Sequence, residues 1–195
     1  MIKTIILASN NKNKVREIKA KLSPLNIDVI SQREAGYDIE VEENGSTCEE
    51  NAILKAKAIY NLAKSPVISD DGGLEVDFLD GKPGIHSARF CGPDATDQDR
   101  YNKILELMKD VEDDKRAARF RCEICYIDEN GQVKIFEGIC EGKIAKEPAG
   151  DDDFGYDPIF LVGDRTFAQM SQEEKNKISH RGKAIDKLVD YLKNM

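Results

Sequence analysis

The sequence lacks the signature motifs of several large enzyme classes. Its 195 residues contain no Gly-x-Ser-x-Gly nucleophile elbow and no Gly-x-Gly dinucleotide fingerprint, and no Gly-Lys pair has a glycine at the Walker A spacing before it. Only two histidines are present, which is too few for a multi-histidine zinc centre. These absences exclude α/β-type serine hydrolases, Rossmann dehydrogenases and P-loop NTPases.

Positive charge and long apolar runs are also scarce. The 29 Lys and Arg residues face 37 Asp and Glu residues, which gives a net charge of −8. Because cationic surfaces supply most of the affinity for nucleic acid, we expect no nucleic-acid partner. No apolar run is long enough to cross a bilayer, and the first apolar run turns polar too early for a secretory signal. We therefore expect no membrane partner and a cytoplasmic location.

The composition predicts a folded chain without a disulfide framework. Hydrophobic residues make up 40% and charged residues 34%, and we expect residues 1–195 to form one domain without an independent linker. The five cysteines are odd in number and irregular in spacing. Cys122 and Cys125 lie in an alternating strand pattern, which places residues three apart on opposite faces. We interpret both as buried structural cysteines rather than as a metal or redox pair.

Hydrophobic periodicity indicates alternating strands and helices. A long helix begins near Thr47, with Ser46 and Glu49 as its expected capping box, and Ser179 opens the last helix. Asn130-Gly131 marks a hairpin turn between two strands. The expected strands cover residues 3–8, 27–31, 67–69, 74–78, 117–128, 133 onward and 158–162; the expected helices precede Pro24, span 47–64 and 97–109, and close the chain. This order predicts an α/β chain with a mixed sheet.

The turn after the first strand carries a pattern suited to binding an anion. Ser9-x-Asn11-x-x-Lys14 joins a strand to a helix N-terminus, where unpaired backbone N–H groups and the helix dipole favour negative charge. Lys14 adds a positive charge and Asn11 a neutral donor. The alternative is ordinary helix capping by the same polar side chains.

Two acidic pairs are candidates for binding a divalent cation. Asp70-Asp71 is expected at a strand end, and Glu42-Glu43 lies in the loop before the long helix. Together they offer the oxygen ligands that Mg²⁺ prefers, although each pair alone also fits a solvated turn. The acidic run at 151–153 is best explained as a solvated loop.

An aromatic loop and a donor-rich helix start complete the candidate residues. In Phe154-Gly155-Tyr156-Asp157, an aromatic ring beside glycine can lie flat over a planar ligand, or it can anchor the loop. His180 and Arg181 place two donors on adjacent residues. The sequence therefore predicts a nucleotide site, built from the anion-binding turn, the carboxylates, the aromatic loop and the donor pair.

Six ordered motifs strongly resemble the non-canonical purine nucleoside triphosphate pyrophosphatases, the inosine/xanthosine triphosphatase family. They cover nearly the whole chain: Ser9-x-Asn11-x-x-Lys14, Glu49-x-Asn51-Ala-x-x-Lys55, Ser69-Asp70-Asp71-x-Gly73-Leu74, Pro83-Gly84-Ile-x-Ser87-Ala88-Arg89, Phe154-Gly155-Tyr156-Asp157-Pro158-Ile159-Phe160 and Ser179-His180-Arg181-Gly182. The resemblance implies a housecleaning enzyme that hydrolyses ITP, dITP and XTP to the monophosphate and pyrophosphate with Mg²⁺, as a homodimer. It implies an elongated two-lobed α/β fold, with a central mixed sheet flanked by helices and the active site in the cleft between the lobes.

The resemblance also assigns roles to individual residues. Asp71 would be the catalytic base and a metal ligand, and Glu42 a second metal ligand. The residues implied in substrate binding are Ser9, Asn10, Asn11, Lys12, Asn13, Lys14, Gly72, Phe154, Gly155, Tyr156, Asp157, Lys175, His180 and Arg181. Two positions depart from the family pattern. Gly72 replaces the usual serine and leaves only a backbone N–H there, and Asn10 stands where glycine is common.

Two other functions are weighed against this one. A Maf-like pyrophosphatase for modified pyrimidine triphosphates would share the phosphate loop, but not the ordered motifs at 154–160 and 179–182. A nucleotide-binding regulator without catalysis would have little use for Asp70, Asp71 and Glu42 beside a triphosphate.

Overall fold

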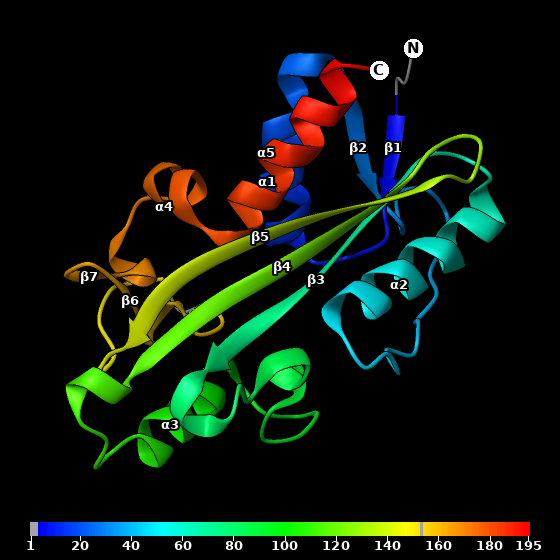
Figure 1. The fold of residues 1–195 in the computed structure, drawn as a ribbon. Coiled ribbons are helices and arrows are strands. Elements are labelled where there is room, and N and C mark those ends of the chain that lie inside the picture. The colour runs from blue at the N-terminus through cyan, green and yellow to red at the C-terminus, as the bar shows by residue number, and fades with distance from the viewer. Residues whose placement is uncertain (1–3, 153) are drawn as a thin grey trace. The chain divides into compact units, whose positions relative to one another are not determined.

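The computed structural model describes residues 4–152 and 154–195, which form five α-helices and one seven-stranded sheet (Figure 1). The strand order is β2-β1-β3-β4-β5-β6-β7. The strands are β1 (Thr4–Leu7), β2 (Asp28–Ser31), β3 (Val67–Val76), β4 (Ala117–Ile127), β5 (Val133–Ile144), β6 (Phe160–Val162) and β7 (Arg165–Thr166). The helices are α1 (Lys12–Leu22), α2 (Cys48–Ala63), α3 (Asp97–Leu107), α4 (Gln172–Ile178) and α5 (His180–Lys193).

The sheet is mixed, as the sequence predicts. β1 pairs in parallel with β2 and β3, whereas β5 with β6 and β6 with β7 are antiparallel. β4 and β5 are neighbours joined by the short loop 128–132, in which the Asp128 carboxylate accepts hydrogen bonds from Asn130 N and Gln132 N. None of the helices in the described residues is long and apolar enough to cross a membrane.

The chain divides into two compact units. The first contains the chain through Asp71, Cys122–Gly138 and Lys183–Met195, and the second contains Gly72–Arg121 and Ile139–Gly182. In the first unit, β1 is buried on both faces: Ile5 and Leu7 pack with α1 and α5, whereas Ile6 and Ala8 pack with α2. A strand covered on both faces needs apolar residues at every position, which explains the run Ile5 to Ala8.

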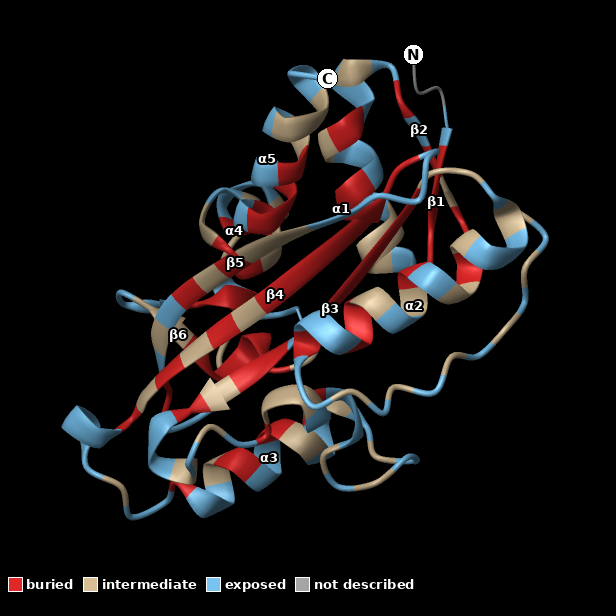
Figure 2. Cartoon of the chain, turned by 45° about the vertical axis from the view of Figure 1, so that its right-hand side comes forward, coloured by how far each residue is buried: buried red, intermediate tan, exposed pale blue. Residues whose placement is uncertain are grey.

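The second unit is built around an aromatic core. Phe120 of β4 lies 4.6 Å from Phe160, and Phe160 lies 5.0 Å from Phe167, measured between ring centroids. Tyr101 and Ile104 of α3 join the same cluster. Figure 2 shows that most of β3 and β4 is buried, although Gly72 of β3 is exposed, whereas the outer face of α3 is exposed.

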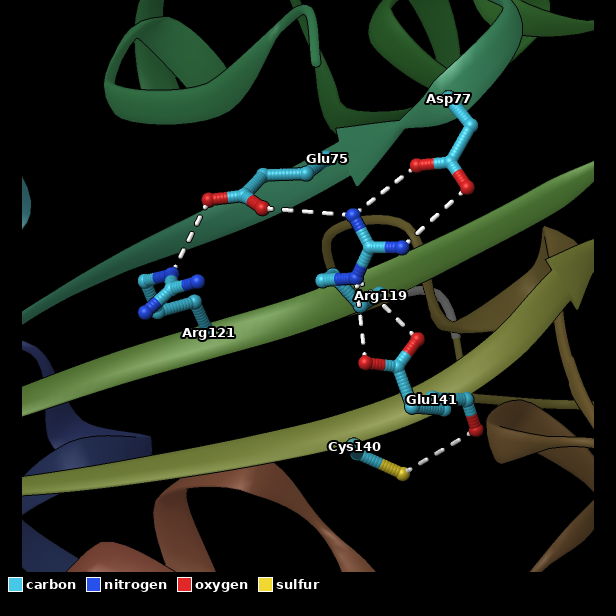
Figure 3. A network of polar contacts seen from close by, with 6 residues as sticks. All are labelled: Glu75, Asp77, Arg119, Arg121, Cys140 and Glu141. Atoms are coloured by element: carbon cyan, nitrogen blue, oxygen red, sulfur yellow. Dashed lines mark hydrogen bonds and ion pairs between the residues drawn. The ribbon is translucent and has the colours of Figure 1, made fainter.

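The opposite face of the sheet in the second unit carries an ion-pair network (Figure 3). Arg119 of β4 contacts Asp77 at 2.9 Å and Glu141 of β5 at 3.1 Å, and Arg121 contacts Glu75 of β3 at 3.1 Å. These charges alternate along β4 with buried Ala118 and Phe120. Pairs of opposite charge on neighbouring strands favour this register over slipped alternatives.

The structure corrects several expected boundaries. β3 runs unbroken from Val67 to Val76, so Asp70 and Asp71 lie inside a strand and not at its end. A side chain at Gly73 would meet the Gly84 carbonyl oxygen at 2.1 Å, so Gly73 permits close backbone packing rather than a turn. The strand expected through residue 78 ends at Val76, and a 3₁₀ turn follows.

The helix cap and the last strands also differ from expectation. Thr47, not Ser46, caps α2 by accepting from Glu50 N at 3.1 Å, while Glu50 accepts from Ser46 N at 2.6 Å. The strand expected at 158–162 begins at Phe160, and the two-residue β7 was not expected. Cys122 and Cys125 belong to different hydrophobic clusters, which confirms that they occupy opposite faces of β4.

Candidate active site

The turn between β1 and α1 uses its own side chains to fix the backbone. Asn11 is the N-cap of α1, and its side-chain oxygen accepts from Asn13 N at 3.0 Å and Lys14 N at 3.2 Å. Ser9 Oγ accepts from Asn11 N, and Asn10 Oδ1 accepts from Arg33 N. Capping is therefore correct for Asn11. An anion at this turn would compete with Asn11 for the N–H groups of Asn13 and Lys14, while the Lys14 side chain adds positive charge.

Adjacent carboxylates on β3 point to opposite faces of the sheet. Asp70 lies on the same face as Ile68 and pairs with Lys14 of α1 at 3.0 Å. Asp71 lies on the α2 face and pairs with Lys55 at 2.9 Å. Because β3 is continuous, Asp70 and Asp71 do not form the shared acidic pair that the sequence indicates. Each instead has its own lysine.

Lys55 links Asp71 to the loop before α2. Its ammonium group lies 3.1 Å from Glu43 Oε1 and 2.9 Å from Asp71 Oδ1. Burial opposes the charge of Lys55, but attraction to Asp71, Asp70 and Glu43 outweighs it and raises the lysine pKa. Lys55 is therefore a fixed cation that holds two carboxylates together.

Asp71 has an unused acceptor. Only 8% of the residue is exposed, and among the described residues its buried Oδ2 atom has no hydrogen-bond partner. Burial raises the pKa of the Asp71 carboxyl above its ordinary value, although attraction to Lys55 opposes that rise. A buried carboxylate oxygen without a partner is costly, so this atom is suited to accept a proton or to bind a cation.

A cavity of about 350 Å³ lies beside these groups in the first unit. It is lined by Ala8, Ser9, Asn10, Lys14, Gln32, Ile39, Glu40, Val41, Glu43, Lys55 and Asp70.

Glu43 faces this cavity, whereas Glu42 is exposed and is not among the lining residues. Lys12 is exposed on the first turn of α1, and Asn13 follows it, half-buried.

The carboxylate oxygens at this site suit a magnesium ion better than a transition metal. Within the parts of the chain that the structure describes, no three His, Cys, Asp or Glu side chains are grouped as a ready-made metal centre. Mg²⁺ is normally held by one or two carboxylates, with phosphate and water oxygens completing its shell. Asp71, with its unpartnered oxygen, and the nearby Glu43 match that limited requirement.

The aromatic loop belongs to the second unit and is anchored at several points. Gly155 N donates to Asp97 Oδ2 at 2.9 Å, and the buried Tyr156 hydroxyl donates to the Ser87 carbonyl at 2.8 Å. Gly155 has φ +61, a conformation that favours glycine. Tyr156 is therefore a loop anchor, whereas the ring of Phe154 is half-buried.

A buried ion pair follows this loop. Asp157 and Lys175 are in direct contact, and 3% and 5% of these residues are exposed. Burial raises the pKa of Asp157 to about 6, against the attraction of Lys175 and Arg181. The Lys175 ammonium also lies 5.3 Å from the centre of the Phe154 ring. Lys175 thereby connects the acid to the aromatic ring that could stack on a base.

The start of α5 belongs to the same unit. Ser179 Oγ accepts from Gly182 N at 3.0 Å, which confirms Ser179 as a cap. His180 is stacked on Phe120, with ring centroids 4.6 Å apart, and Arg181 is half-buried. A side chain at Gly182 would meet the Asn176 carbonyl oxygen at 2.0 Å, so glycine is required there. Gly72, on β3, is exposed.

Sequence reasoning gave no separate role to three residues that the structure emphasises. Lys55 entered only as part of a motif, although a lysine among the buried α2 positions Asn51, Ala52 and Ala56 signals a paired charge. Glu43 could not be separated from Glu42 by sequence. Asp97 gave no local signal, because its partner Gly155 is 58 residues away.

The comparisons identify the family. The sequence profile of the Ham1 family matches residues 5–191, and the chain belongs to that family. It is 47% identical to the "dITP/XTP pyrophosphatase" of Clostridium perfringens, with 100% of this chain and 99% of the relative covered. It is also 47% identical to the Escherichia coli K12 protein of the same name, covering 97% and 98%.

Solved structures agree with this assignment. The Ham1 protein of Staphylococcus aureus is 42% identical and superposes with a TM-score of 0.89, covering 98% of this chain and 99% of that one. The HAM1 protein of Coxiella burnetii is 41% identical, with a TM-score of 0.91 and full coverage of both chains.

Proposed function

We propose that this protein hydrolyses the non-canonical purine nucleoside triphosphates ITP, dITP and XTP to the monophosphate and pyrophosphate. The observation that carries the proposal is the match of 47% identity, over essentially the whole of both chains, to relatives named dITP/XTP pyrophosphatase. The lysines and carboxylates around the cavity of the first unit supply chemistry suited to a triphosphate. Removal of such nucleotides would cleanse the nucleotide pool.

The first unit supplies the residues for the phosphate chain. Lys14 holds phosphate oxygens at the start of α1, where the helix dipole also favours negative charge, and Lys55 keeps Asp71 in place. Pyrophosphate release requires water to attack the α-phosphorus. Asp71 orients that water and accepts its proton at Oδ2, the oxygen that Lys55 leaves unused.

We propose Mg²⁺ as the cofactor. Lys14 and Lys55 are already paired with carboxylates, so the chain alone offers little net positive charge to a triphosphate. Asp71 and Glu43 would hold the ion; Glu42, the ligand that the family resemblance implies, is exposed and does not line the cavity. When bound, Mg²⁺ neutralises phosphate charge that otherwise repels the attacking water.

The loop at 154–157 and the start of α5 carry the residues proposed for the base. The Phe154 ring stacks on the purine, and the loop through Asp157, with Lys175 and His180, shapes its surroundings. Arg181 has donors only, so it pairs with the 6-oxo group of hypoxanthine or xanthine and opposes the 6-amino group of adenine. A mismatch of this kind discriminates by on the order of 10⁴.

We propose that the active protein is a homodimer that works in the cytoplasm, where nucleotide precursors are used. Support for the dimer comes from the family resemblance. Light scattering of the purified chain measures it directly, and a monomeric mass at micromolar concentration would contradict it.

One assay tests the proposed reaction. Pyrophosphate release is measured from ITP, XTP, ATP, GTP and a methylated pyrimidine triphosphate, with and without Mg²⁺, for the wild type and the Asp71→Asn variant. We expect rapid turnover of ITP and XTP that requires both Mg²⁺ and Asp71. Preference for the pyrimidine nucleotide would favour a Maf-like activity, and tight binding without turnover would favour a regulator; either result would refute the proposal.

A further inference from the structure

We propose that Asp97 is a positioning residue that sets base recognition without touching the nucleotide. Asp97 is the first residue of α3, and its two carboxylate oxygens have different partners. Oδ2 accepts from the backbone N–H of Gly155 at 2.9 Å, and Oδ1 contacts Arg100 at 2.5 Å. The inference rests on the proposed function, because it concerns the loop that would bind the purine.

The contact falls on a loop residue that has no side chain of its own to anchor it. Gly155 has φ +61, and a side chain added there would meet no atom within 4 Å. Its neighbours have other hydrogen bonds. The Tyr156 hydroxyl donates to the Ser87 carbonyl, and the Phe154 backbone donates to Asp152 Oδ1 at 3.3 Å and accepts from Asp157 N at 3.2 Å. The bond from Asp97 therefore fixes the backbone orientation between the stacking ring and its anchor.

The second oxygen keeps the acid aimed at the loop. Arg100 lies one turn further along α3; its side chain is 15% exposed and that of Asp97 is 38% exposed, so their pairing is partly sheltered from solvent. A carboxylate bonded on both sides has little rotational freedom. A charged acceptor also binds a backbone N–H more strongly than a neutral one does. The Asp97 side chain is thus held in one orientation by Arg100 and by the Gly155 N–H.

The same helix provides a matched control. Asp99 also lies in the first turn of α3, but its carboxylate completes a capping box with Thr96, at 2.8 Å from Thr96 N and 2.6 Å from Thr96 Oγ1. Removal of Asp99 weakens the helix start and removes one negative charge, as removal of Asp97 does. Only the Asp97 change releases the Gly155 N–H.

The test compares Asp97→Ala, Asp97→Asn and Asp99→Ala with the wild type. We expect Asp97→Ala to raise KM for ITP about tenfold, the effect of losing a charge-assisted hydrogen bond, with kcat within about twofold. Inhibition by inorganic tripolyphosphate, which has no base, should not change. Asp97→Asn retains an oxygen acceptor and should recover most of the loss, and Asp99→Ala should keep KM within about twofold of wild type.

A second readout does not depend on activity. Hydrogen exchange of the amides at 154–157 should quicken in Asp97→Ala and not in Asp99→Ala, because only the first variant frees Gly155. Equal exchange in the two variants, equal KM values, or weaker tripolyphosphate inhibition in Asp97→Ala would each overturn the inference. Failure of the wild type to release pyrophosphate from ITP would refute the proposed function instead, and the exchange measurement would still decide whether Asp97 holds the loop.

Discussion

The buried acid Asp157 predicts an unusual dependence of stability on pH. Its pKa is raised from 3.8 to about 6, chiefly by burial and against the attraction of Lys175. The native state therefore binds this proton more tightly than the unfolded chain does. The resulting contribution to stability is fully present below about pH 3.8 and is lost as pH rises through about 6.

The size of the effect follows from the two pKa values. Each tenfold change in proton affinity is worth about 1.4 kcal/mol, so the complete loss amounts to about 3 kcal/mol. Between about pH 5 and about pH 7.5, where a nucleotide enzyme is readily studied, the linkage relation gives a loss of about 1.4 kcal/mol.

Urea unfolding of the wild type and Asp157→Asn across this pH range isolates the effect. The variant cannot titrate at this position, and the constant cost of leaving Lys175 without its partner cancels when only the slopes are compared. We expect the unfolding free energy of the wild type to fall by about 1.4 kcal/mol relative to that of the variant. Asp164→Asn, a change at an exposed acid between β6 and β7, reports the removal of one charge alone.

The opposite slope would refute the reasoning. If wild-type stability rises with pH relative to Asp157→Asn, attraction to Lys175 exceeds the cost of burial, and the pKa of Asp157 is lowered in the native protein. A difference that does not vary with pH would show that the carboxyl titrates alike in the native and unfolded states.

Three further predictions concern the first unit. Asp71→Asn should reduce pyrophosphate release by more than about 10³-fold, because the change removes the base. The affinity for ITP, measured by calorimetry, should stay within a few-fold of wild type, because the phosphate contacts remain. Retained activity would show that Asp71 is not the base. Glu43→Gln should raise the Mg²⁺ concentration needed for half activity, and Glu42→Gln should not. The reason is that only Glu43 faces the cavity and contacts Lys55. A raised Mg²⁺ requirement in Glu42→Gln but not in Glu43→Gln would favour Glu42 as the ligand. Lys55→Ala should lower the unfolding free energy by about 3 kcal/mol, because it leaves buried Asp71 without its cation. Lys57 is exposed on the same helix, and Lys57→Ala should lower the unfolding free energy by less than about 0.5 kcal/mol. Equal urea midpoints for the two variants would contradict this prediction.

Local sequence signals predicted most of the first unit. β1, α1 and β2 were expected because apolar residues recur at strand and helix spacing and because Pro24 ends the helix. The hairpin of β4 and β5 followed from Asn130-Gly131. In each case the residues that decide the conformation lie within a few positions of one another.

The errors arose where distant residues decide the conformation. Two acids and two glycines at 70–73 read as a turn, but β3 lies in the sheet between β1 and β4 and stays extended, and Gly73 leaves room for Gly84. The same error concealed that Asp70 and Asp71 face opposite sides of the sheet. For the site, sequence placed Lys14 and Asp71 near phosphate chemistry, yet the pairing of Lys55 with Glu43 depends on how the loop before α2 folds back.

The prior pairing of both cavity lysines has a kinetic consequence. A free triphosphate approaches a chain of net charge −8, and the two nearest ammonium groups are already balanced by carboxylates at 3.0 and 2.9 Å. Long-range attraction, which accelerates capture at strongly basic clefts, is therefore weak. Because chain and nucleotide are both anionic, we expect encounter rates that rise with ionic strength, which screens the repulsion, and that rise when the polyanion arrives with a divalent counterion. Lys14 and Lys55 then leave their carboxylates for phosphate oxygens only after the nucleotide has made contact. The protein therefore discriminates among nucleotides after they bind, because it does not attract polyphosphates from a distance.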